Sequence, residues 1–205
     1  MSEIIVYDCE QGSAEWLQAR CGVPTASRSS DIMAKGQGIT RKKYMRTLAG
    51  EILTGEIAES FSNPHMERGQ IMEAEACNMF AFMHDVDPQV VGFMRRGRFG
   101  ASPDRLIGDN GLLEVKTKLP HLQIETLDGG KLPSEHKAQV MAQLWVSGRD
   151  FCDFISYWPK LPLFHVRVER DDLYIANLAQ EVEDFLGELD ALVSKYSPTE
   201  LEQAA

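Results

Sequence analysis

Closely spaced cysteines are missing from this sequence. The chain has four cysteines, and no two of them form a Cys-x-x-Cys pair: Cys9, Cys21, Cys77 and Cys152. Structural zinc sites and iron–sulfur clusters depend on such pairs, so the sequence argues against both. Scattered cysteines also favour reduced thiols over a disulfide framework, and we expect a cytoplasmic protein.

Long apolar runs and cofactor signatures are missing as well. No run approaches the roughly 20 residues that a membrane-spanning helix needs, and the first residues do not begin a signal peptide. No Gly-rich phosphate loop or Cys–His pair supports a metabolic enzyme. The length of 205 residues predicts a single domain over residues 1–205, in which residues 197–205 form a frayed tail.

Positive charge is also in short supply. The chain has 21 Lys and Arg against 31 Asp and Glu, which gives a formal net charge of −10. A protein that binds DNA by broad electrostatics is expected to be basic, so this charge counts modestly against DNA binding. Two local clusters could neutralise phosphates or could be solvated faces: Arg41, Lys42, Lys43 and Arg46, and Arg95, Arg96 and Arg98.

Two carboxylates and a lysine are the most informative residues that are present. Asp104 is followed after nine residues by Glu114, and Lys116 lies two residues further on, as in the PD-(D/E)xK nucleases. Two close carboxylates repel each other unless a cation lies between them, and hard oxygen ligands suit Mg²⁺ or Mn²⁺. Lys116 could orient or deprotonate a water molecule. Taken alone, the same residues could form a solvated rim with a surface ion pair.

The residues between the two carboxylates predict a hairpin. Asn110-Gly111 is a strong turn signal, so residues 101–107 and 112–117 should form adjacent antiparallel strands. Because side chains alternate across a strand, Glu114 and Lys116 should share one face. The turn can then bring Glu114 close to Asp104.

Periodicity and turn residues predict the remaining elements. We expect helices over residues 13–20, 27–33, 41–58, 66–84, 135–146 and 171–195, strands over 4–7, 90–93, 98–100, 151–158 and 163–168, and a mobile polar connection over 120–133. This order indicates an α/β fold, in which helices flank a mixed central β-sheet on both sides.

Five segments in order resemble the lambda-type (YqaJ-like) phage alkaline exonucleases. They span about residues 12–185: WLQARCGVPTAS (16–27), RGQIME (68–73), ASPD (101–104), LEVK (113–116) and AQVMAQLWV (138–146). The resemblance implies a PD-(D/E)xK, restriction-endonuclease-like core. It also implies Mg²⁺-dependent 5′-to-3′ digestion of linear double-stranded DNA, with two ions per active site and Mn²⁺ as a substitute. Such digestion leaves 3′ single-stranded overhangs for homologous recombination.

The resemblance also assigns catalytic roles by position. The metal ligands would be Glu73, Asp104, Glu114 and the backbone carbonyl of Val115, while Lys116 would serve the attacking water. Independently of the family, Glu73 lies among apolar residues in its predicted helix, so it needs a partner. An exposed ion pair four residues along that helix is the alternative, but no Lys or Arg stands at the required positions.

A DNA-end site follows from the same resemblance. The family's 5′-phosphate pocket maps onto Arg20, Ser27, Ser102 and Gln139. Ser27 could also cap a helix, and Gln139 could be a buried amide. Met66 matches the residue that wedges between the DNA strands, although it could instead be a staple to the core. We expect Trp16 to pack in the core.

The family further implies partners that the sequence does not display. Its members form a ring-shaped homotrimer around the duplex and work with a single-strand annealing protein. Two other functions stay open: an endonuclease or junction resolvase on the same core, and a catalytically inactive DNA-binding module. The segment between Lys116 and Gln139 is also shorter than we expect for the phage enzyme.

Overall fold

A computed structural model describes residues 3–34, 38–57 and 64–197, except for the side chains of residues 64–67 and 70. The elements of this part of the chain are β1 (Ile4–Tyr7), α1 (Ala14–Arg20), the 3-10 turn η1 (Ala26–Arg28), α2 (Ser29–Met33), α3 (Ile39–Thr54), α4 (Pro64–His84), β2 (Phe93–Arg96), β3 (Phe99–Ala101), β4 (Arg105–Ile107), β5 (Gly111–Thr117), α5 (Pro120–Gly129), α6 (Ser134–Ser147), β6 (Phe151–Tyr157), β7 (Phe164–Glu169) and α7 (Asp172–Tyr196). None of the helices described here is long and apolar enough to cross a membrane. Beyond Ser197, the predicted tail lies outside the described residues.

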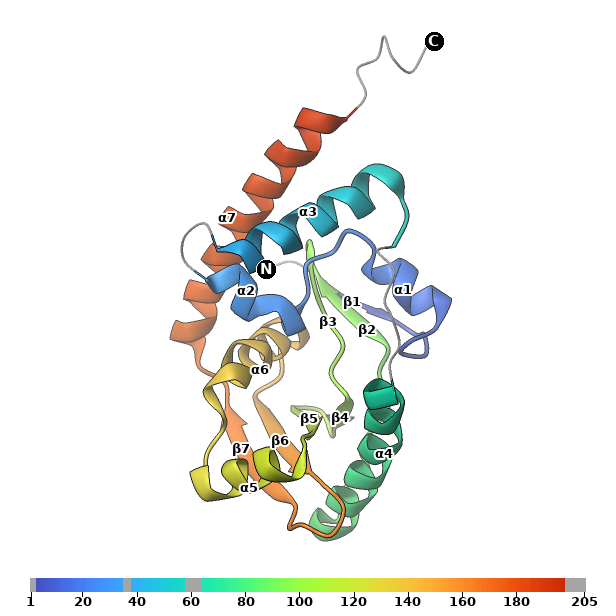
Figure 1. The fold of residues 1–205 in the computed structure, drawn as a ribbon, viewed down its shortest axis with the longest axis vertical. Helices are drawn as coiled ribbons and strands as arrows, with labels where there is room; N and C mark the ends of the chain where they lie inside the picture. The colour runs from blue at the N-terminus through green and yellow to red at the C-terminus, as the bar shows by residue number, and fades with distance from the viewer. Residues whose placement is uncertain (1–2, 35–37, 58–63, 198–205) are drawn as a thin grey trace.

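The strands divide into two sheets rather than joining in one. β1, β2 and β3 form an antiparallel sheet, whereas β4, β5, β6 and β7 form a mixed sheet in which β5 and β6 are parallel. A backbone bridge between Gln89 and Leu106 joins β4 to the segment that leads into β2. The two sheets occupy different levels of the molecule (Figure 1).

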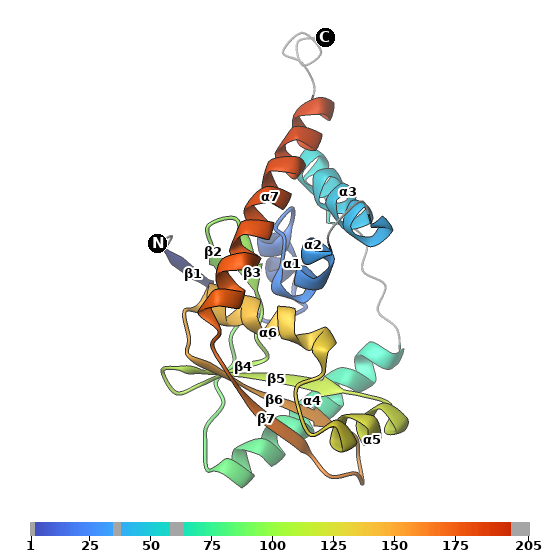
Figure 2. The ribbon, with the colours of Figure 1, turned by 90° about the vertical axis from the view of Figure 1, so that its left-hand side faces the viewer.

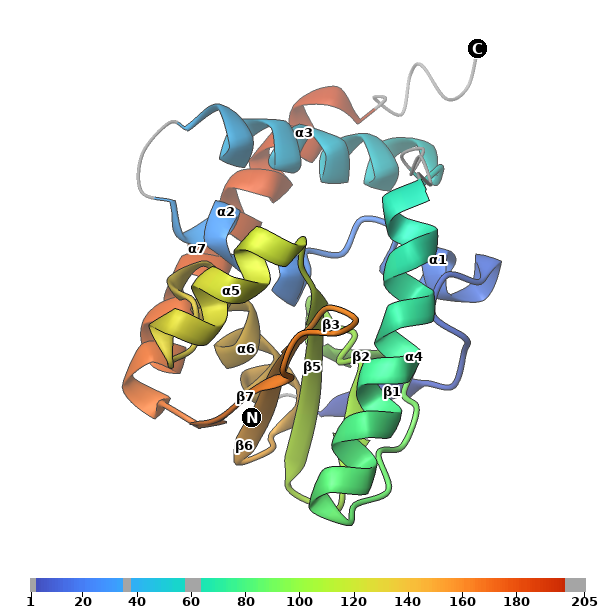
Figure 3. The same ribbon diagram turned by 60° about the horizontal axis from the view of Figure 1, so that its bottom comes forward.

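Helices cover both faces of the four-stranded sheet, as the sequence predicts. Leu113 and Val115 pack in a core with residues of α4, whereas Leu112 packs with residues of α6. Figure 3 shows α4 on one side of β5 and β6, and α5 and α6 on the other. Since Glu114 and Lys116 alternate with Val115, both face the α6 side. The predicted shared face is therefore confirmed.

A second layer of helices packs on the three-stranded sheet. α7 runs beside α3 and lies over α6 (Figure 2). Its N-cap is Asp171, whose carboxylate accepts a hydrogen bond from the backbone N–H of Tyr174 at 3.0 Å. Its buried positions recur with helical spacing, at Leu178, Val182 and Phe185. The long amphipathic helix that the sequence predicts is confirmed.

The predicted hairpin is confirmed, but its turn is different. Asn110-Gly111 does not form the turn, because Gly111 is the first residue of β5 and pairs with Ile107. Gly108 supplies the positive φ, at 49°. Gly111 meets another need: a Cβ there would lie 2.4 Å from the Phe151 ring. The first strand is also shorter than predicted, since Ala101 belongs to β3 in the other sheet.

The prediction of a mobile connection over residues 120–133 is wrong, because α5 fills most of it. Pro120 occupies the first turn of that helix, where its missing N–H costs nothing, and Gly130 ends the helix with φ 60°. The helix buries Gln123 and Thr126 rather than an apolar stripe. Its periodicity is therefore hidden from a search for apolar spacing. α3 also ends earlier than predicted, at Thr54, and Gly55 is its C-cap.

Candidate active site

Asp104 lies directly before β4, where the hairpin brings it against β5. Its Oδ2 accepts a hydrogen bond from the backbone N–H of Val115 at 2.6 Å. Arg105 pairs with Leu113, so the same register places Asp104 opposite Glu114. Burial raises the pKa of Asp104 well above its ordinary value, and repulsion by Glu114 and then Glu73 raises it further. The predicted approach of the two carboxylates is confirmed.

Glu114 is a buried carboxylate held by three donors. Its side chain is 1% exposed. Lys116 Nζ and Gln139 Nε2 donate to Oε1 at 2.5 and 2.6 Å, and Gln143 Nε2 donates to Oε2 at 2.6 Å. The two glutamines lie four residues apart on α6, so both reach the same point on β5. The clamp fixes the direction of this carboxylate.

Glu73 approaches from α4. Its Oε1 accepts a hydrogen bond from an Arg105 guanidinium nitrogen at 3.2 Å. Burial raises the pKa of Glu73, and repulsion by Glu114 raises it further, although the charge of Arg105 lowers it. The expected need for a partner is confirmed. That partner comes from β4, not from the exposed face of the same helix.

Lys116 is an ammonium among carboxylates. Burial alone would lower the pKa of this lysine, but Glu114 and Asp104 outweigh burial and the net pKa is raised. In this state Lys116 keeps its proton, so it acts as a hydrogen-bond donor and a positive charge.

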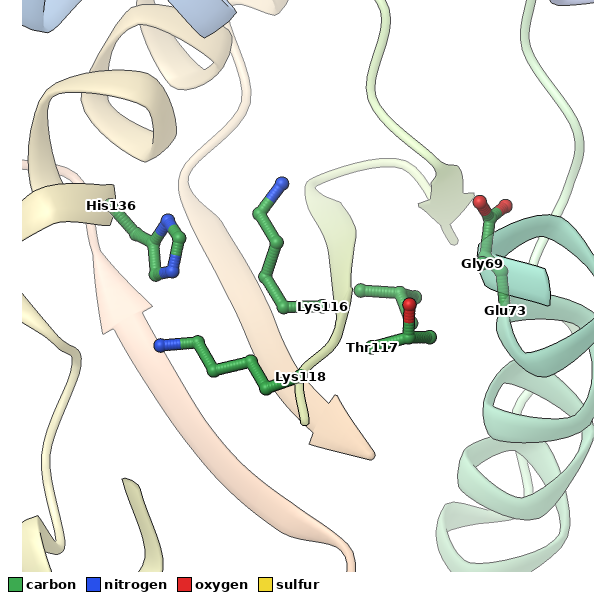
Figure 4. Close-up of a pocket in the computed structure, with 7 residues that line it drawn as sticks. Gly69, Glu73, Lys116, Thr117, Lys118 and His136 are labelled. Atoms are coloured by element: carbon green, nitrogen blue, oxygen red, sulfur yellow. The ribbon is translucent and has the colours of Figure 1, made fainter. Parts of the chain in front are cut away.

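A cavity of about 420 Å³ opens beside Lys116. Figure 4 shows Lys116, Lys118 and His136 on one side, with Glu73 of α4 across the end of β5. Burial lowers the pKa of His136 to about 4, and the two lysines lower it in the same direction. His136 is therefore neutral near pH 7, and its buried Nε2 has no hydrogen-bond partner among the described residues.

The carboxylates fit a divalent cation by their chemistry. Among the described residues, no three His, Cys, Asp or Glu side chains already stand in the geometry of a metal site. The donor set nevertheless consists of hard oxygens, and a cation would relieve the repulsion that raises the pKa values of Asp104 and Glu73.

A second cavity, of about 950 Å³, reaches from Glu73 and Arg105 to Arg20 and Ser27. The Arg20 guanidinium lies 4.0 Å from the centre of the Trp16 ring. Burial lowers the pKa of Arg20, but Glu51 and Tyr44 oppose that effect. The cavity holds three arginines and three glutamates: Arg20, Arg28, Arg105, Glu10, Glu51 and Glu73.

Ser102 contacts two residues that line the larger cavity, Trp16 and Arg20, whereas Gln139 contacts Glu114. Trp16 Nε1 donates to Ser102 Oγ at 2.9 Å, and Arg20 donates to the same oxygen at 3.4 Å. Gln139 instead donates to Glu114, and it is not among the residues that line the cavity. The structure thus brings Arg20, Ser27 and Ser102 together and places Gln139 with the carboxylates.

Two further expectations have different outcomes. The expected core position of Trp16 is wrong, because α1 has no buried residue and Trp16 lines the larger cavity. Met66 lies in the first turn of α4. Its side chain is outside the described residues, so the wedge role stays a prediction.

Comparison with protein families decides the relationship. The family described as the YqaJ-like viral recombinase domain matches residues 15–150. The chain belongs to the YqaJ-like family. No curated protein matches the sequence significantly. The predicted family resemblance is confirmed.

Solved structures agree with this assignment. An alkaline exonuclease, LHK-Exo from Laribacter hongkongensis, is similar in its complex with dAMP, with 38% identity, a TM-score of 0.83, and coverage of 89% of this chain and 95% of that chain. Another crystal structure of LHK-Exo gives 37% identity and a TM-score of 0.82 over the same shares of the two chains. A phage-related exonuclease from Haemophilus somnus 129PT shares the fold at 15% identity, with a TM-score of 0.65 and coverage of 85% and 96%. The YqaJ-like chain thus has the expected PD-(D/E)xK type of α/β fold.

The basic clusters of this YqaJ-like chain are partly neutralised. Arg41 donates to both carboxylate oxygens of Glu188 at 2.7 and 2.8 Å, and Arg98 donates to both oxygens of Asp190 at 2.7 Å. Both acids lie on α7. Both arginines are therefore engaged in ion pairs, and of the two only Arg98 belongs to a solvated face, since the Arg41 side chain is 12% exposed.

The motif search missed two residues of the site: Arg105, which binds Glu73, and Gln143, which binds Glu114. Arg105 follows Asp104 directly. Gln139 and Gln143 have the spacing of one helix face, which was a usable signal for a shared target. Neither residue stands out by type alone.

Proposed function

We propose that this chain is a Mg²⁺-dependent exonuclease that digests linear double-stranded DNA from its 5′ ends. The convergence of Asp104, Glu114, Glu73 and Lys116 at the end of β5 carries the proposal. It is supported by the 38% identity to a protein described as an alkaline exonuclease. The product would be a duplex with 3′ single-stranded overhangs for homologous recombination.

The carboxylates divide the work with Lys116. Asp104, Glu114 and Glu73 would hold two Mg²⁺ ions, helped by the carbonyl of Val115, and Mn²⁺ would substitute. When bound, these ions would polarise the scissile phosphate and lower the pKa of a water molecule. Lys116 would donate a hydrogen bond to that water and would offset the negative charge that builds up on the phosphate.

The larger cavity suits the 5′-phosphate of a DNA end. Arg20 can bind a phosphate with two nitrogens, and its stacking on Trp16 holds the guanidinium plane in place. The hydroxyls of Ser27 and Ser102 add donors. The cavity continues to Glu73, so a strand gripped here leads into the carboxylate site. End recognition at this position favours an exonuclease over an endonuclease or resolvase.

Three further features follow from the family. Met66 would wedge between the strands ahead of cleavage. A homotrimeric ring would hold the duplex during processive digestion, and a single-strand annealing protein would receive the overhang. These features belong to the proposal and have their own tests, such as the mass of the protein in solution.

One gel separates the candidate functions. End-labelled linear duplex and covalently closed circular duplex are incubated with the protein in Mg²⁺ and in EDTA. We expect loss of label from linear DNA in Mg²⁺ alone, with the circle intact. Cleavage of the circle would indicate an endonuclease or resolvase, and binding without any cleavage would indicate an inactive DNA-binding module.

A further inference from the structure

Two glutamines of α6 contact one carboxylate, and they do so differently. Gln139 and Lys116 donate to the same oxygen of Glu114, so the loss of either leaves that oxygen one donor. Gln143 is the one described donor to the other oxygen. The rotation of the Glu114 carboxylate about its Cγ–Cδ bond therefore depends on Gln143 more than on Gln139.

Gln143 itself is poorly satisfied. It is 1% exposed, and its carbonyl oxygen Oε1 is buried with no hydrogen-bond partner in the described part of the chain. An unpartnered buried carbonyl is costly to the fold. The amide N–H that donates to Glu114 is therefore the paired part of the Gln143 side chain in the described structure.

The chain offers a glutamine that meets the opposite description. Gln123 of α5 is fully buried, and its Nε2 donates to the carbonyls of Ser156 and Pro162 at 2.9 and 3.0 Å. Its Oε1 accepts from the Ser156 hydroxyl at 2.6 Å. Both ends of this amide are paired with structural groups, as expected for a glutamine that stabilises the fold.

We propose that Gln143 is a positioning residue: its amide fixes the second oxygen of Glu114, and this sets the affinity of the site for the divalent cation. The inference deepens the proposed nuclease function and rests on it. Gln143 acts through Glu114 and needs no contact with DNA. Partners that orient a metal-binding carboxylate typically change metal affinity or activity by about tenfold to one-hundredfold when they are removed.

Methionine is the substitution that tests this role. Gln143→Met keeps the length of the side chain and removes its donor, but it also removes the unpartnered carbonyl. Loss of the hydrogen bond to Glu114 lowers the stability of the fold, and removal of the buried unpartnered carbonyl raises it. The midpoint of thermal unfolding without metal should therefore stay within about 3 °C of wild type. Gln123→Met is the matched control, because it breaks three hydrogen bonds of a fully paired buried amide.

The experiment measures three quantities on each purified full-length protein. These are the unfolding midpoint without metal, Mg²⁺ affinity by calorimetric titration without DNA, and the Mg²⁺ dependence of digestion of linear duplex. For Gln143→Met we expect Mg²⁺ affinity lowered about tenfold to one-hundredfold at a nearly unchanged midpoint. For Gln123→Met we expect a lowered midpoint with Mg²⁺ affinity within about twofold of wild type.

Each outcome has one meaning. Wild-type Mg²⁺ affinity in Gln143→Met would overturn the positioning role while the proposed function stands. A midpoint that falls as far as in Gln123→Met, or failure to fold, would show that Gln143 is structural and would overturn it as well. If the wild-type protein neither binds Mg²⁺ nor digests linear DNA, the proposed function itself fails.

Discussion

Replacing Lys116 with methionine removes the ammonium group from the carboxylate cluster and keeps most of the side chain's volume. Lys116 Nζ lies 2.5 Å from Glu114 Oε1, and the Glu114 side chain is only 1% exposed. Gln139 and Gln143 remain as donors to Glu114, so the variant does not leave this carboxylate without partners. The loss is that of one hydrogen bond to a charged group, about 1.5–3 kcal/mol.

That loss is measurable but survivable. For a domain of this size, it corresponds to a fall of about 3–12 °C in the unfolding midpoint. The catalytic effect should be larger, because no other described ammonium donates to this carboxylate pair. We expect cleavage of linear duplex to fall by a factor of about 10² to 10⁴.

Single-turnover digestion of end-labelled duplex in Mg²⁺ measures the cleavage rate. DNA binding is measured with Ca²⁺ in place of Mg²⁺, and it should stay within a few-fold of wild type. Lys137→Met is the matched control. Lys137 lies on the surface of α6, where its Nζ is 3.7 Å from Asp171 Oδ2, so the Lys137→Met variant should cleave DNA at the wild-type rate. Cleavage by Lys116→Met at the wild-type rate, with folding intact, would refute the role assigned to Lys116.

Three other perturbations test separate parts of the structure. Arg20→Met should abolish the preference for a 5′-phosphorylated over a 5′-hydroxyl end in matched digestion assays; a preference of wild-type size would count against the cavity as the phosphate site. Asp104→Asn should abolish cleavage yet raise the unfolding midpoint of the metal-free protein, because it removes a buried repelling charge and keeps an acceptor for Val115; a lower midpoint would contradict this. The fold lowers the pKa of His136 from 6.5 to about 4. The unfolded chain therefore binds a proton at His136 more tightly than the folded chain does. As a result, the free energy of unfolding should fall by up to about 3 kcal/mol as the pH drops from 6.5 to 4. Urea unfolding at both pH values should show a smaller difference for His136→Phe, and an equal difference would exclude His136 as its source.

The sequence predicts the carboxylate site well because alternation on a strand is a local property. Once Glu114 and Lys116 are placed on β5, their shared face follows, and the hairpin then brings in Asp104. The turn within that hairpin could not be predicted from Asn110-Gly111. Gly111 is required by the close Phe151 ring of β6, a contact between segments 40 residues apart in the sequence.

Other errors have the same origin in contacts that are distant along the chain. α5 buries the amide of Gln123 against β6, so an apolar pattern does not report it. Arg105 looks like a surface residue of a short strand until α4 places Glu73 beside it. Gln139, which the resemblance assigns to the phosphate pocket, donates to Glu114 in this fold, a contact that its position in the sequence does not reveal; its phosphate role stays a prediction. Tertiary packing decided the partner in each of these cases.

The formal charge of −10 no longer opposes a DNA enzyme once the charges are placed. α7 carries six acidic residues against one lysine, and two of these acids bind Arg41 and Arg98. α7 packs on α3 and α6, apart from the face of the four-stranded sheet that α4 covers (Figure 2). An acidic helix there repels DNA from its own side of the molecule, and such repulsion is short-ranged at physiological salt. At the other end, Lys116 and Lys118 line one cavity, while three arginines and three glutamates line the next. The proposed function therefore places DNA on the side of the molecule away from α7.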